Sequence, residues 1–299
     1  NLPGGLDINH LIDDLRIISW EAAEILIYYS NQLKNEKFHQ GLIKIKDNDE
    51  PVSLADLKVN ELIISRIREK YNYLDWHLLS EENGIIKFNN SKINNWLWVL
   101  DPLDGTRDFL QKTSNYALHL ALNYQNKPYL GIVLIPEKDE LWISNNKMVW
   151  CENKAGVKQK FKLDTNKKKI KDMTLVTSKN HKNQVLKNII DTIKFRKSIV
   201  IGSIGCKIAS ILRGESDIYI SMSLPGQSSP KDWDFAAPES ILIAAGGAIT
   251  DIDNKELIYN KPQYKQEGMI VASNNKNNHE EICSQLKKKL SENNIYPFN

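Results

Sequence analysis

The chain has 299 residues, of which 41% are hydrophobic and 26% are charged, so it is long enough and apolar enough to bury a substantial core. Its formal net charge of +3 is too small for its size to indicate a nucleic-acid-binding protein. The lysine runs at 167–169 and 287–289 fit a solvated loop and a solvated helix face.

The first half predicts two helices followed by a series of strands. Apolar residues between Ile12 and Tyr29 recur at spacings of three, four and seven, which predicts one helix, and a second is predicted over 54–70. The apolar run 96–100 predicts a buried strand that ends at Asp101-Pro102. Further strands are predicted over 117–124, 129–135, 141–144 and 148–151. Short connections between them favour an antiparallel meander in an α+β first half.

A polar, lysine-rich stretch over 153–172 is the candidate boundary between two domains, 1–160 and 161–299. Beyond it, strand patterns alternate with helix patterns, which favours an α/β second half. The predicted strands cover 174–178, 198–201, 217–220, 248–252 and 269–272. The predicted helices cover 185–193, 205–213, 234–245 and 280–290.

The segment Asp101-Pro-Leu-Asp104-Gly-Thr106 is the most informative one for chemistry, because it follows a buried strand at a turn forced by proline and glycine. Two carboxylates three positions apart at such a turn can converge on one point. Like charges about 4 Å apart repel by roughly 4 kcal/mol at an effective dielectric constant of 20. A divalent cation removes that cost, and an all-oxygen ligand set suits Mg²⁺.

Two other segments add carboxylates to this turn. Glu81 and Glu82 follow an apolar pair, and Asp234 stands at the start of a predicted helix, where the helix dipole favours an anion. A single acidic pair is more often a capped surface turn. The set Glu81, Asp101, Asp104 and Asp234, reached by an apolar strand, instead predicts a metal site.

Spacing excludes two other interpretations of the turn. An EF-hand loop counted from Asp101 requires oxygen ligands where Leu103, Gly105 and Lys112 stand. A phosphatase with an aspartyl nucleophile and a second aspartate two residues later is also excluded, because that position is Leu103. The attacking group is therefore predicted to be water.

Four segments, 51–56, 81–82, 98–106 and 233–237, together resemble the inositol monophosphatase-like, lithium-sensitive phosphatases. The resemblance covers about residues 54–251. It implies a layered αβαβα sandwich, two or three Mg²⁺ ions and inhibition by Li⁺. Its ligand assignment by position gives Glu81, Asp101 and the backbone carbonyl of Leu103 to one ion, and Asp101, Asp104 and Asp234 to another.

The same resemblance implies catalytic roles for Thr106, Asp56 and Glu81. Thr106, linked to Asp56, is expected to orient and deprotonate the attacking water, and the N–H groups of Gly105 and Thr106 are expected to hold the phosphate at a helix start. His119, inside a strand pattern, is interpreted as a packed or hydrogen-bonded residue and not as a catalytic one.

Within the family, the segments 176–181, 202–207 and 214–219 resemble the 3′(2′),5′-bisphosphate nucleotidases. The implied substrate is 3′-phosphoadenosine 5′-phosphate, a by-product of sulfate activation and sulfonate transfer, which loses its 3′-phosphate to give AMP. The residues implied to bind it are Gly105, Thr106, Arg107, Ser178, His181, Ser203 and Lys207. Ser203 and Lys207 are expected to bind the uncleaved phosphate, and His181 to stack on adenine.

Some residues depart from the pattern of the family, so alternative roles for them and alternative functions for the protein stay open. Lys179 stands where the family has arginine, which weakens the case for bidentate phosphate binding. Lys207 is alternatively a solvated helix lysine, and His181 a helix cap. The alternative functions are an inositol monophosphatase or a sugar phosphatase such as fructose 1,6-bisphosphatase, and a non-enzymatic metal or nucleotide sensor.

The remaining expectations concern the cellular location and the partners of the protein. No apolar stretch approaches the roughly 20 residues that cross a bilayer, and residues 1–14 lack a signal-peptide pattern. Cys151, Cys206 and Cys283 are widely spaced and form no Cys-x-x-Cys pair. These features favour a cytoplasmic protein with no membrane or nucleic-acid partner. A monomer or a homodimer is expected, although no feature of the sequence selects between them.

Overall fold

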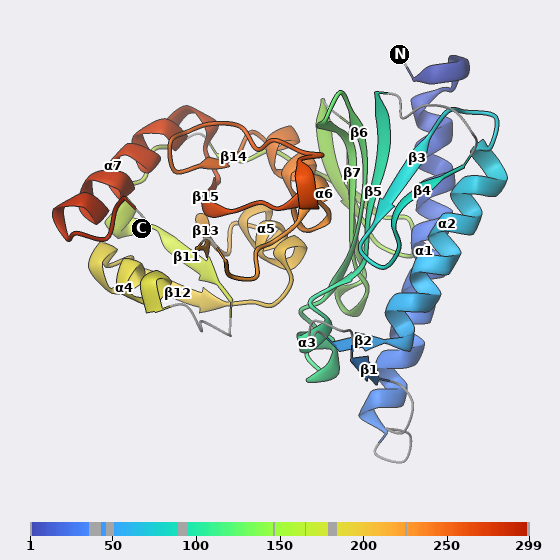
Figure 1. Ribbon diagram of the computed structural model, residues 1–299, viewed down its shortest axis with the longest axis horizontal. Coiled ribbons are helices and arrows are strands. Elements are labelled where there is room, and N and C mark those ends of the chain that lie inside the picture. Colours follow the sequence, from blue (N-terminus) through green and yellow to red (C-terminus); the bar gives the residue numbers. More distant parts are fainter. Residues whose placement is uncertain are drawn as a thin grey trace.

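Two large β-sheets alternate with three layers of helices in the described part of this protein, and a third sheet has only two strands. The structure, a computed structural model, describes residues 2–35, 43–45, 51–88, 95–145, 147–164, 166–178, 184–224 and 226–297. In Figure 1, α1 and α2 cover one face of the larger sheet, α5 and α6 lie between the two sheets, and α4 and α7 cover the far face of the smaller sheet. The αβαβα sandwich implied by the sequence resemblance is therefore confirmed.

The larger sheet has eight strands in the order β10-β9-β8-β7-β6-β5-β3-β4. All neighbouring pairs are antiparallel except β3 and β5, which are parallel. The predicted meander corresponds to β5 to β9, whereas β3, β4 and β10 were not predicted. The bounds are β3 His77–Ser80, β4 Gly84–Lys87, β5 Trp96–Asp104, β6 Ala117–Tyr124, β7 Lys127–Ile135, β8 Glu140–Asn145, β9 Met148–Glu152 and β10 Lys158–Phe161.

Helices α1 (Ile8–Lys34) and α2 (Leu54–Tyr71) form the outer layer on this sheet. Asp7 caps α1 by accepting hydrogen bonds from the backbone N–H groups of the first turn, and Ser53 and Asp56 form a capping box at α2. Their buried apolar faces pack on the sheet around Trp76 and Trp98. Among the described residues, the structure contains no helix that is both long and apolar enough to span a membrane.

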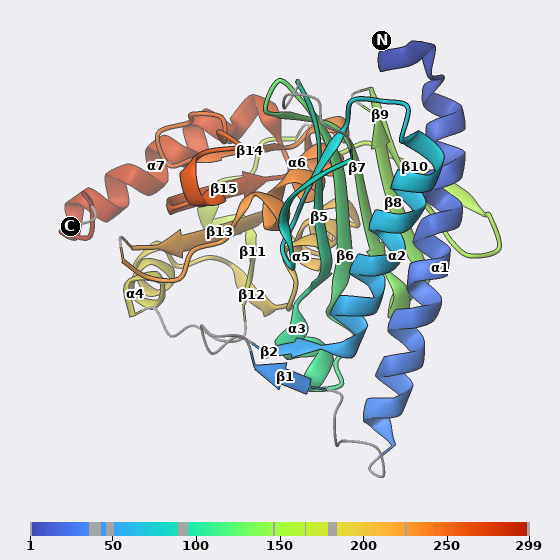
Figure 2. The same cartoon turned by 45° about the vertical axis from the view of Figure 1, so that its right-hand side comes forward.

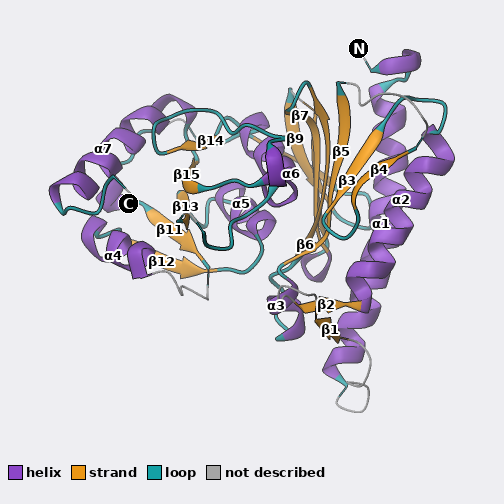
Figure 3. Cartoon of the chain, in the orientation of Figure 1, coloured by secondary structure: helices purple, strands orange, loops and turns teal. Residues whose placement is uncertain are grey.

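The smaller sheet has five strands in the order β12-β11-β13-β15-β14. Strands β12, β11 and β13 are parallel, and β15 runs antiparallel to β13 and to β14. The predicted alternation of strands and helices is correct, although the sheet is mixed and not wholly parallel (Figure 3). The bounds are β11 Thr174–Thr177, β12 Lys197–Val200, β13 Ile218–Ser223, β14 Ala248–Asp251 and β15 Gly268–Ser273.

The central layer joins the two sheets through one hydrophobic cluster. Helices α5 (Ile204–Leu212) and α6 (Asp232–Ala244) bury residues such as Ile208 and Phe235 against both sheets. Helices α4 (Gln184–Ile193) and α7 (His279–Glu292) pack over the opposite face of the smaller sheet, as Figure 2 shows. Because the two halves share this core, their division into domains 1–160 and 161–299 stays a prediction.

Two short elements complete the surroundings of the site. The ribbon of β1 (Ile43–Ile45) and β2 (Pro51–Ser53) leads into α2, and the five-residue helix α3 (Thr106–Leu110) follows β5 directly. Both lie at the same end of the larger sheet in Figure 1. The end of β5 therefore meets the start of α2 and the start of α3 at one place.

Candidate active site

Three aspartates from both halves of the chain gather between the sheets. Carboxylate oxygens of Asp101, Asp104 and Asp234 lie within 4.8 Å of one another. Asp101 and Asp104 stand at the end of β5, and Asp234 lies in the first turn of α6, where its Oδ2 accepts a hydrogen bond from Lys231 N at 2.6 Å. The sequence predicted this convergence, and the structure confirms that the three side chains meet.

The turn that carries Asp101 and Asp104 is shaped by local hydrogen bonds. The ladder between β5 and β6 changes register between these two residues, and Leu103 N donates to Asp101 Oδ1 at 3.0 Å. Gly105 then takes a left-handed conformation with φ +87°, and a Cβ atom there would lie 3.0 Å from Asn115 O. Glycine is therefore required for the chain to turn from β5 into α3.

Glu81 joins the aspartates through the pairing of β3 with β5. Ser80 lies opposite Leu100 in this parallel pair, and Glu81 N donates to Leu100 O at 3.1 Å. This register brings Glu81 beside Asp101. Burial raises the pKa of Asp101 well above its usual value, and the nearby charges of Glu81, Asp104 and Asp234 raise the pKa further.

This donor set fits a divalent cation. Asp101 is 2% exposed, so ionising it places a negative charge out of water among other carboxylates. Crowded acidic groups of this kind are stable in their ionised form only when a cation offsets their repulsion. Since every donor is oxygen, the cluster suits a hard cation better than it suits zinc, which prefers nitrogen and sulfur.

Thr106 and Asp56 lie against the same turn. Thr106 Oγ1 is 3.3 Å from Asp56 Oδ1 and 3.1 Å from Leu103 O. Asp56 Oδ2 accepts hydrogen bonds from Ser53 N at 2.8 Å and Ser53 Oγ at 2.6 Å, so the cap of α2 fixes its position. Burial raises the pKa of Asp56 to about 7, and the charges of Glu81 and Glu82 contribute.

Asp104 also anchors the first turn of α5. Its Oδ2 accepts hydrogen bonds from Ser203 Oγ at 2.7 Å and Ile204 N at 2.5 Å. Ser203 Oγ in turn accepts one from Cys206 N at 3.2 Å, as an N-cap residue does. Ser203 has φ +25°, a conformation that costs on the order of 1–3 kcal/mol. Its bond to Asp104 helps to hold this strained cap in place.

The two residues expected to bind a second phosphate face inward. Ser203 and Lys207 are 4% and 3% exposed, which contradicts the interpretation of Lys207 as a solvated helix lysine. Lys207 Nζ donates to Ser203 O at 3.3 Å and lies 5.3 Å from the centre of the Tyr219 ring. Burial lowers the pKa of Lys207, whereas the charge of Asp104 raises it. Their contact with a phosphate stays a prediction.

The other residues expected to bind substrate are placed unevenly. Gly105 and Thr106 lie at the start of α3, and the exposed Arg107 follows in its first turn. Ser178, partly buried, comes directly after β11. Lys179 and His181 lie outside the described residues, so the predicted stacking of His181 on adenine stays a prediction.

His119 is a participant whose partners sequence reasoning did not identify. It is 0% exposed and stands opposite Asp101 in the β5–β6 ladder. Its Nε2 accepts a hydrogen bond from Gly205 N at 3.1 Å and lies 3.3 Å from Asp104 Oδ2. Burial lowers the pKa of His119, opposed by the charge of Asp104. The prediction of a packed, hydrogen-bonded histidine is confirmed.

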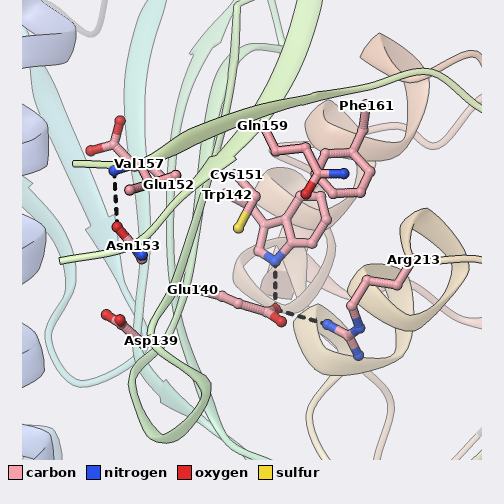
Figure 4. Close-up of a pocket in the computed structure, with 10 residues that line it drawn as sticks. All are labelled: Asp139, Glu140, Trp142, Cys151, Glu152, Asn153, Val157, Gln159, Phe161 and Arg213. Atoms are coloured by element: carbon pink, nitrogen blue, oxygen red, sulfur yellow. Dashed lines mark hydrogen bonds and ion pairs between the residues drawn. The ribbon is translucent and has the colours of Figure 1, made fainter. Parts of the chain in front are cut away.

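Two cavities lie near opposite ends of α5. The one in Figure 4, of about 420 Å³, lies beyond the C-terminal end of α5, whereas Asp104 contacts the N-terminal end of that helix. Its Glu140 already accepts hydrogen bonds from Trp142 Nε1 at 2.9 Å and from Arg213 Nη1 at 2.8 Å. This cavity therefore presents paired charges and is separate from the acidic cluster.

The second cavity, of about 440 Å³, lies beside α3. It is lined by Asp108, Thr113, Asn115, Val200 and Gly202, which come from α3, the loop after it and the segment leading into α5. Asn115 O and Ser203 N both lie close to Gly105, so this space opens beside the turn that carries Asp104. The three clustered aspartates are not among its lining residues.

A two-sheet sandwich with a buried acidic cluster at the end of a central strand defines a class of metal-dependent phosphatases. A family model described as the inositol monophosphatase family matches residues 13–291. The chain belongs to this family. The predicted recognition is thus confirmed, and the chain is a phosphatase of the inositol monophosphatase family.

Two relatives in this comparison carry names that state an activity. The 3′(2′),5′-bisphosphate nucleotidase CysQ of Buchnera aphidicola is 31% identical over 212 residues, which cover 69% of this chain and 73% of the relative. The enzyme of the same name from Haemophilus influenzae is 26% identical over 261 residues, covering 84% and 88%. The prediction of a phosphoric monoester hydrolase that resembles these nucleotidases is confirmed.

Solved structures support the fold. The extragenic suppressor protein suhB from Bartonella henselae superposes with a TM-score of 0.73 at 20% identity. The superposition covers 95% of this chain and 99% of that protein. At this identity the likeness concerns the architecture alone.

Proposed function

We propose that this protein is a Mg²⁺-dependent phosphomonoesterase that removes the 3′-phosphate of 3′-phosphoadenosine 5′-phosphate to give AMP. The observation that carries the proposal is the meeting of Asp101, Asp104 and Asp234 within 4.8 Å, beside the Thr106–Asp56 pair. A simple metal sensor has no need of a hydroxyl and a buried carboxyl poised to handle a proton. A hydrolase that activates water can use both to orient the water and to accept its proton.

The proposed metal ligands are Glu81, Asp101, Asp104, Asp234 and the carbonyl of Leu103. Bound divalent cations supply two things in such a site: they make water a better nucleophile at neutral pH and they offset charge on the leaving oxygen. The protein supplies the carboxylates from three segments, and the hydrogen bonds described above hold two of them, Asp104 and Asp234, in place. The number of ions is proposed to be two or three.

Thr106 and Asp56 are proposed to handle the proton of the attacking water. When the Thr106 hydroxyl donates to Asp56, its lone pairs are available to accept a hydrogen bond from water, which orients the water toward the phosphate. A carboxyl with a pKa of about 7 can accept a proton near neutral pH. Glu81, beside Asp101, completes the predicted catalytic set and contributes negative charge that favours the protonated form of Asp56.

The residues that line the cavity next to Gly105 suit an uncharged part of the proposed substrate. Among its lining residues, all described, Asp108 is acidic and none is basic. Such a lining suits a sugar or a base, through Asp108, Asn115 and Thr113, better than it suits a phosphate. The uncleaved phosphate is proposed to bind Ser203 and Lys207. Arg107, Ser178 and His181 are proposed to contact the remainder of the nucleotide, and Gly105 and Thr106 to donate their N–H groups to the phosphate that is cleaved.

A panel of substrates tests the proposal. Purified protein with Mg²⁺ is expected to release phosphate from 3′-phosphoadenosine 5′-phosphate at least tenfold faster, in kcat/KM, than from inositol 1-phosphate or fructose 1,6-bisphosphate. A comparable or reversed order would assign the chain to the inositol or sugar phosphatases, which are the alternative within the same family. Li⁺ is expected to inhibit the preferred reaction, and AMP identified by chromatography establishes which phosphate is lost.

A further inference from the structure

His119 occupies the point where three segments of the site meet. It belongs to β6, and its fully buried side chain lies in the central layer, close to the starts of α5 and α6. Nδ1 is 3.3 Å from Trp233 O, the carbonyl directly before Asp234. Nε2 is 3.1 Å from Gly205 N and 3.3 Å from Asp104 Oδ2. One imidazole therefore contacts elements that carry two of the three clustered aspartates.

The chemistry of these contacts selects one form of the ring. A backbone carbonyl can only accept a hydrogen bond, and a backbone N–H can only donate one. Trp233 O therefore requires a proton on Nδ1, and Gly205 N requires a free lone pair on Nε2. The neutral tautomer protonated at Nδ1 satisfies both. In this form Gly205 N–H also points toward Asp104 Oδ2, 3.4 Å away, so the histidine and the aspartate share one donor.

The packing at Gly205 is matched to the histidine. A Cβ atom at this position would lie 2.3 Å from His119 Nε2 and 2.7 Å from Val133 Cγ1. Only glycine therefore allows the first turn of α5 to come this close to β6. This close approach is an observation independent of the hydrogen bonds, and it indicates that the contact between the ring and α5 is a fixed part of the fold.

We propose that His119 is a positioning residue that sets the spacing between Asp104 and Asp234. It holds the start of α6 through Trp233 O and the start of α5 through Gly205 N, and α5 in turn binds Asp104 through Ile204 N. The inference rests on the proposed role of these aspartates in cation binding. Groups that orient metal ligands in this way typically change metal affinity by about 10- to 100-fold when they are removed.

The test measures Mg²⁺ affinity by titration calorimetry in the absence of substrate. His119→Ala is expected to weaken Mg²⁺ binding at least tenfold. His119→Asn is expected to recover part of the loss, because its amide N–H can occupy the place of Nδ1–H and donate to Trp233 O. The matched control is His279→Ala, another buried histidine, which bonds to Ser273 and Thr250 at the smaller sheet. Its Mg²⁺ affinity is expected to stay within twofold of the wild type.

Two outcomes overturn the proposal. One is a His119→Ala protein that is folded and binds Mg²⁺ as tightly as the wild type. The other, which needs no variant, is a two-bond ¹H–¹⁵N spectrum of the labelled protein that places the His119 proton on Nε2. If His119→Ala fails to fold, that spectrum and the His119→Asn titration decide. Failure of the proposed function is distinguished by the wild type itself, which would then bind no Mg²⁺ or release no phosphate.

Discussion

The Thr106 hydroxyl lies 3.3 Å from Asp56 Oδ1, although fifty residues separate them in the chain. The link depends on two local structures: the Ser53–Asp56 capping box that begins α2 and the left-handed turn at Gly105 that begins α3. Each of these is a common device for starting a helix. Their meeting at the end of β5 is what places a buried carboxyl beside a hydroxyl at the acidic cluster.

Removing the Thr106 hydroxyl is expected to lower kcat about 100-fold, because the proposed route for the water proton is lost. Thr106→Val keeps the shape of the side chain, and Thr106→Ser keeps the hydroxyl and should retain most activity. Asp56→Asn combined with Thr106→Val should cost little more than either change alone, since the two residues act as a unit. Steady-state phosphate release checks this, and a Thr106→Val rate within threefold of the wild type would refute the role.

Asp101→Asn is expected to separate stability from function. In the absence of metal it should raise the free energy of unfolding by about 1–3 kcal/mol, because it removes a buried carboxyl group that is costly to ionise among like charges. The same change should abolish most of the rise in Tm that Mg²⁺ gives the wild type. Thermal melts with Mg²⁺ and with EDTA make the measurement. The exposed Asp13→Asn is the control and should change neither quantity.

Gly105→Ala is expected to destabilise the protein by about 2–4 kcal/mol. The residue has φ +87°, and the added methyl group would press on Asn115 O and Ser203 N. Gly156→Ala separates the two effects, because Gly156 has φ +82° but nothing within 4 Å of a Cβ atom. Urea unfolding should show a clearly larger loss at position 105. Equal losses would mean that the close contacts contribute nothing.

Glu239 is expected to make stability fall as pH rises. Burial raises its pKa to about 8, partly offset by the hydrogen bond from Tyr259. Because the ordinary value is 4.5, the folded protein holds this proton across pH 4.5–8 while the unfolded chain loses it. The group therefore favours folding at low pH and loses that contribution as pH approaches 8, with an upper bound of about 5 kcal/mol.

Glu239→Gln should remove this pH dependence, since the amide carries no charge at any pH. The difference in unfolding free energy between variant and wild type is expected to grow in favour of the variant from pH 5 to pH 8. Glu61→Gln, at an exposed ion pair with Lys58, should leave the wild-type slope unchanged. A constant difference between Glu239→Gln and wild type across this range would contradict the expectation.

The parts of the fold and of the site that depend on residues close together in the sequence could be predicted from the sequence. The turn at 101–106 is recognisable in the sequence from its proline, its glycine and its paired carboxylates, and an apolar strand leads into it. The long helices and the strands of the meander follow from clear hydrophobic periods. By contrast, β10 is an edge strand whose side chains are largely exposed, so its polar composition resembles a loop.

The remaining features depend on tertiary contacts. His119 has no sequence signal beyond its small neighbours Ala117 and Ala121, and its partners become identifiable only once α5 is known to approach β6 through Gly205. Lys207 looks like any surface lysine in sequence, because the helix that carries it is buried on all sides by the packing of the two sheets. The burial and the contacts of such residues can be assigned only once the fold is known.

The central claim is that carboxylates from β5, α6 and the end of β3 bind divalent cations that the hydrolysis requires. The most direct measurement is the initial rate of phosphate release from 3′-phosphoadenosine 5′-phosphate by EDTA-treated, metal-free protein as Mg²⁺ is added back. We expect no release above background without Mg²⁺, a saturable return of activity with it, and none at any concentration for Asp234→Asn. Undiminished release by the metal-free protein, or full activity in Asp234→Asn, would contradict the account.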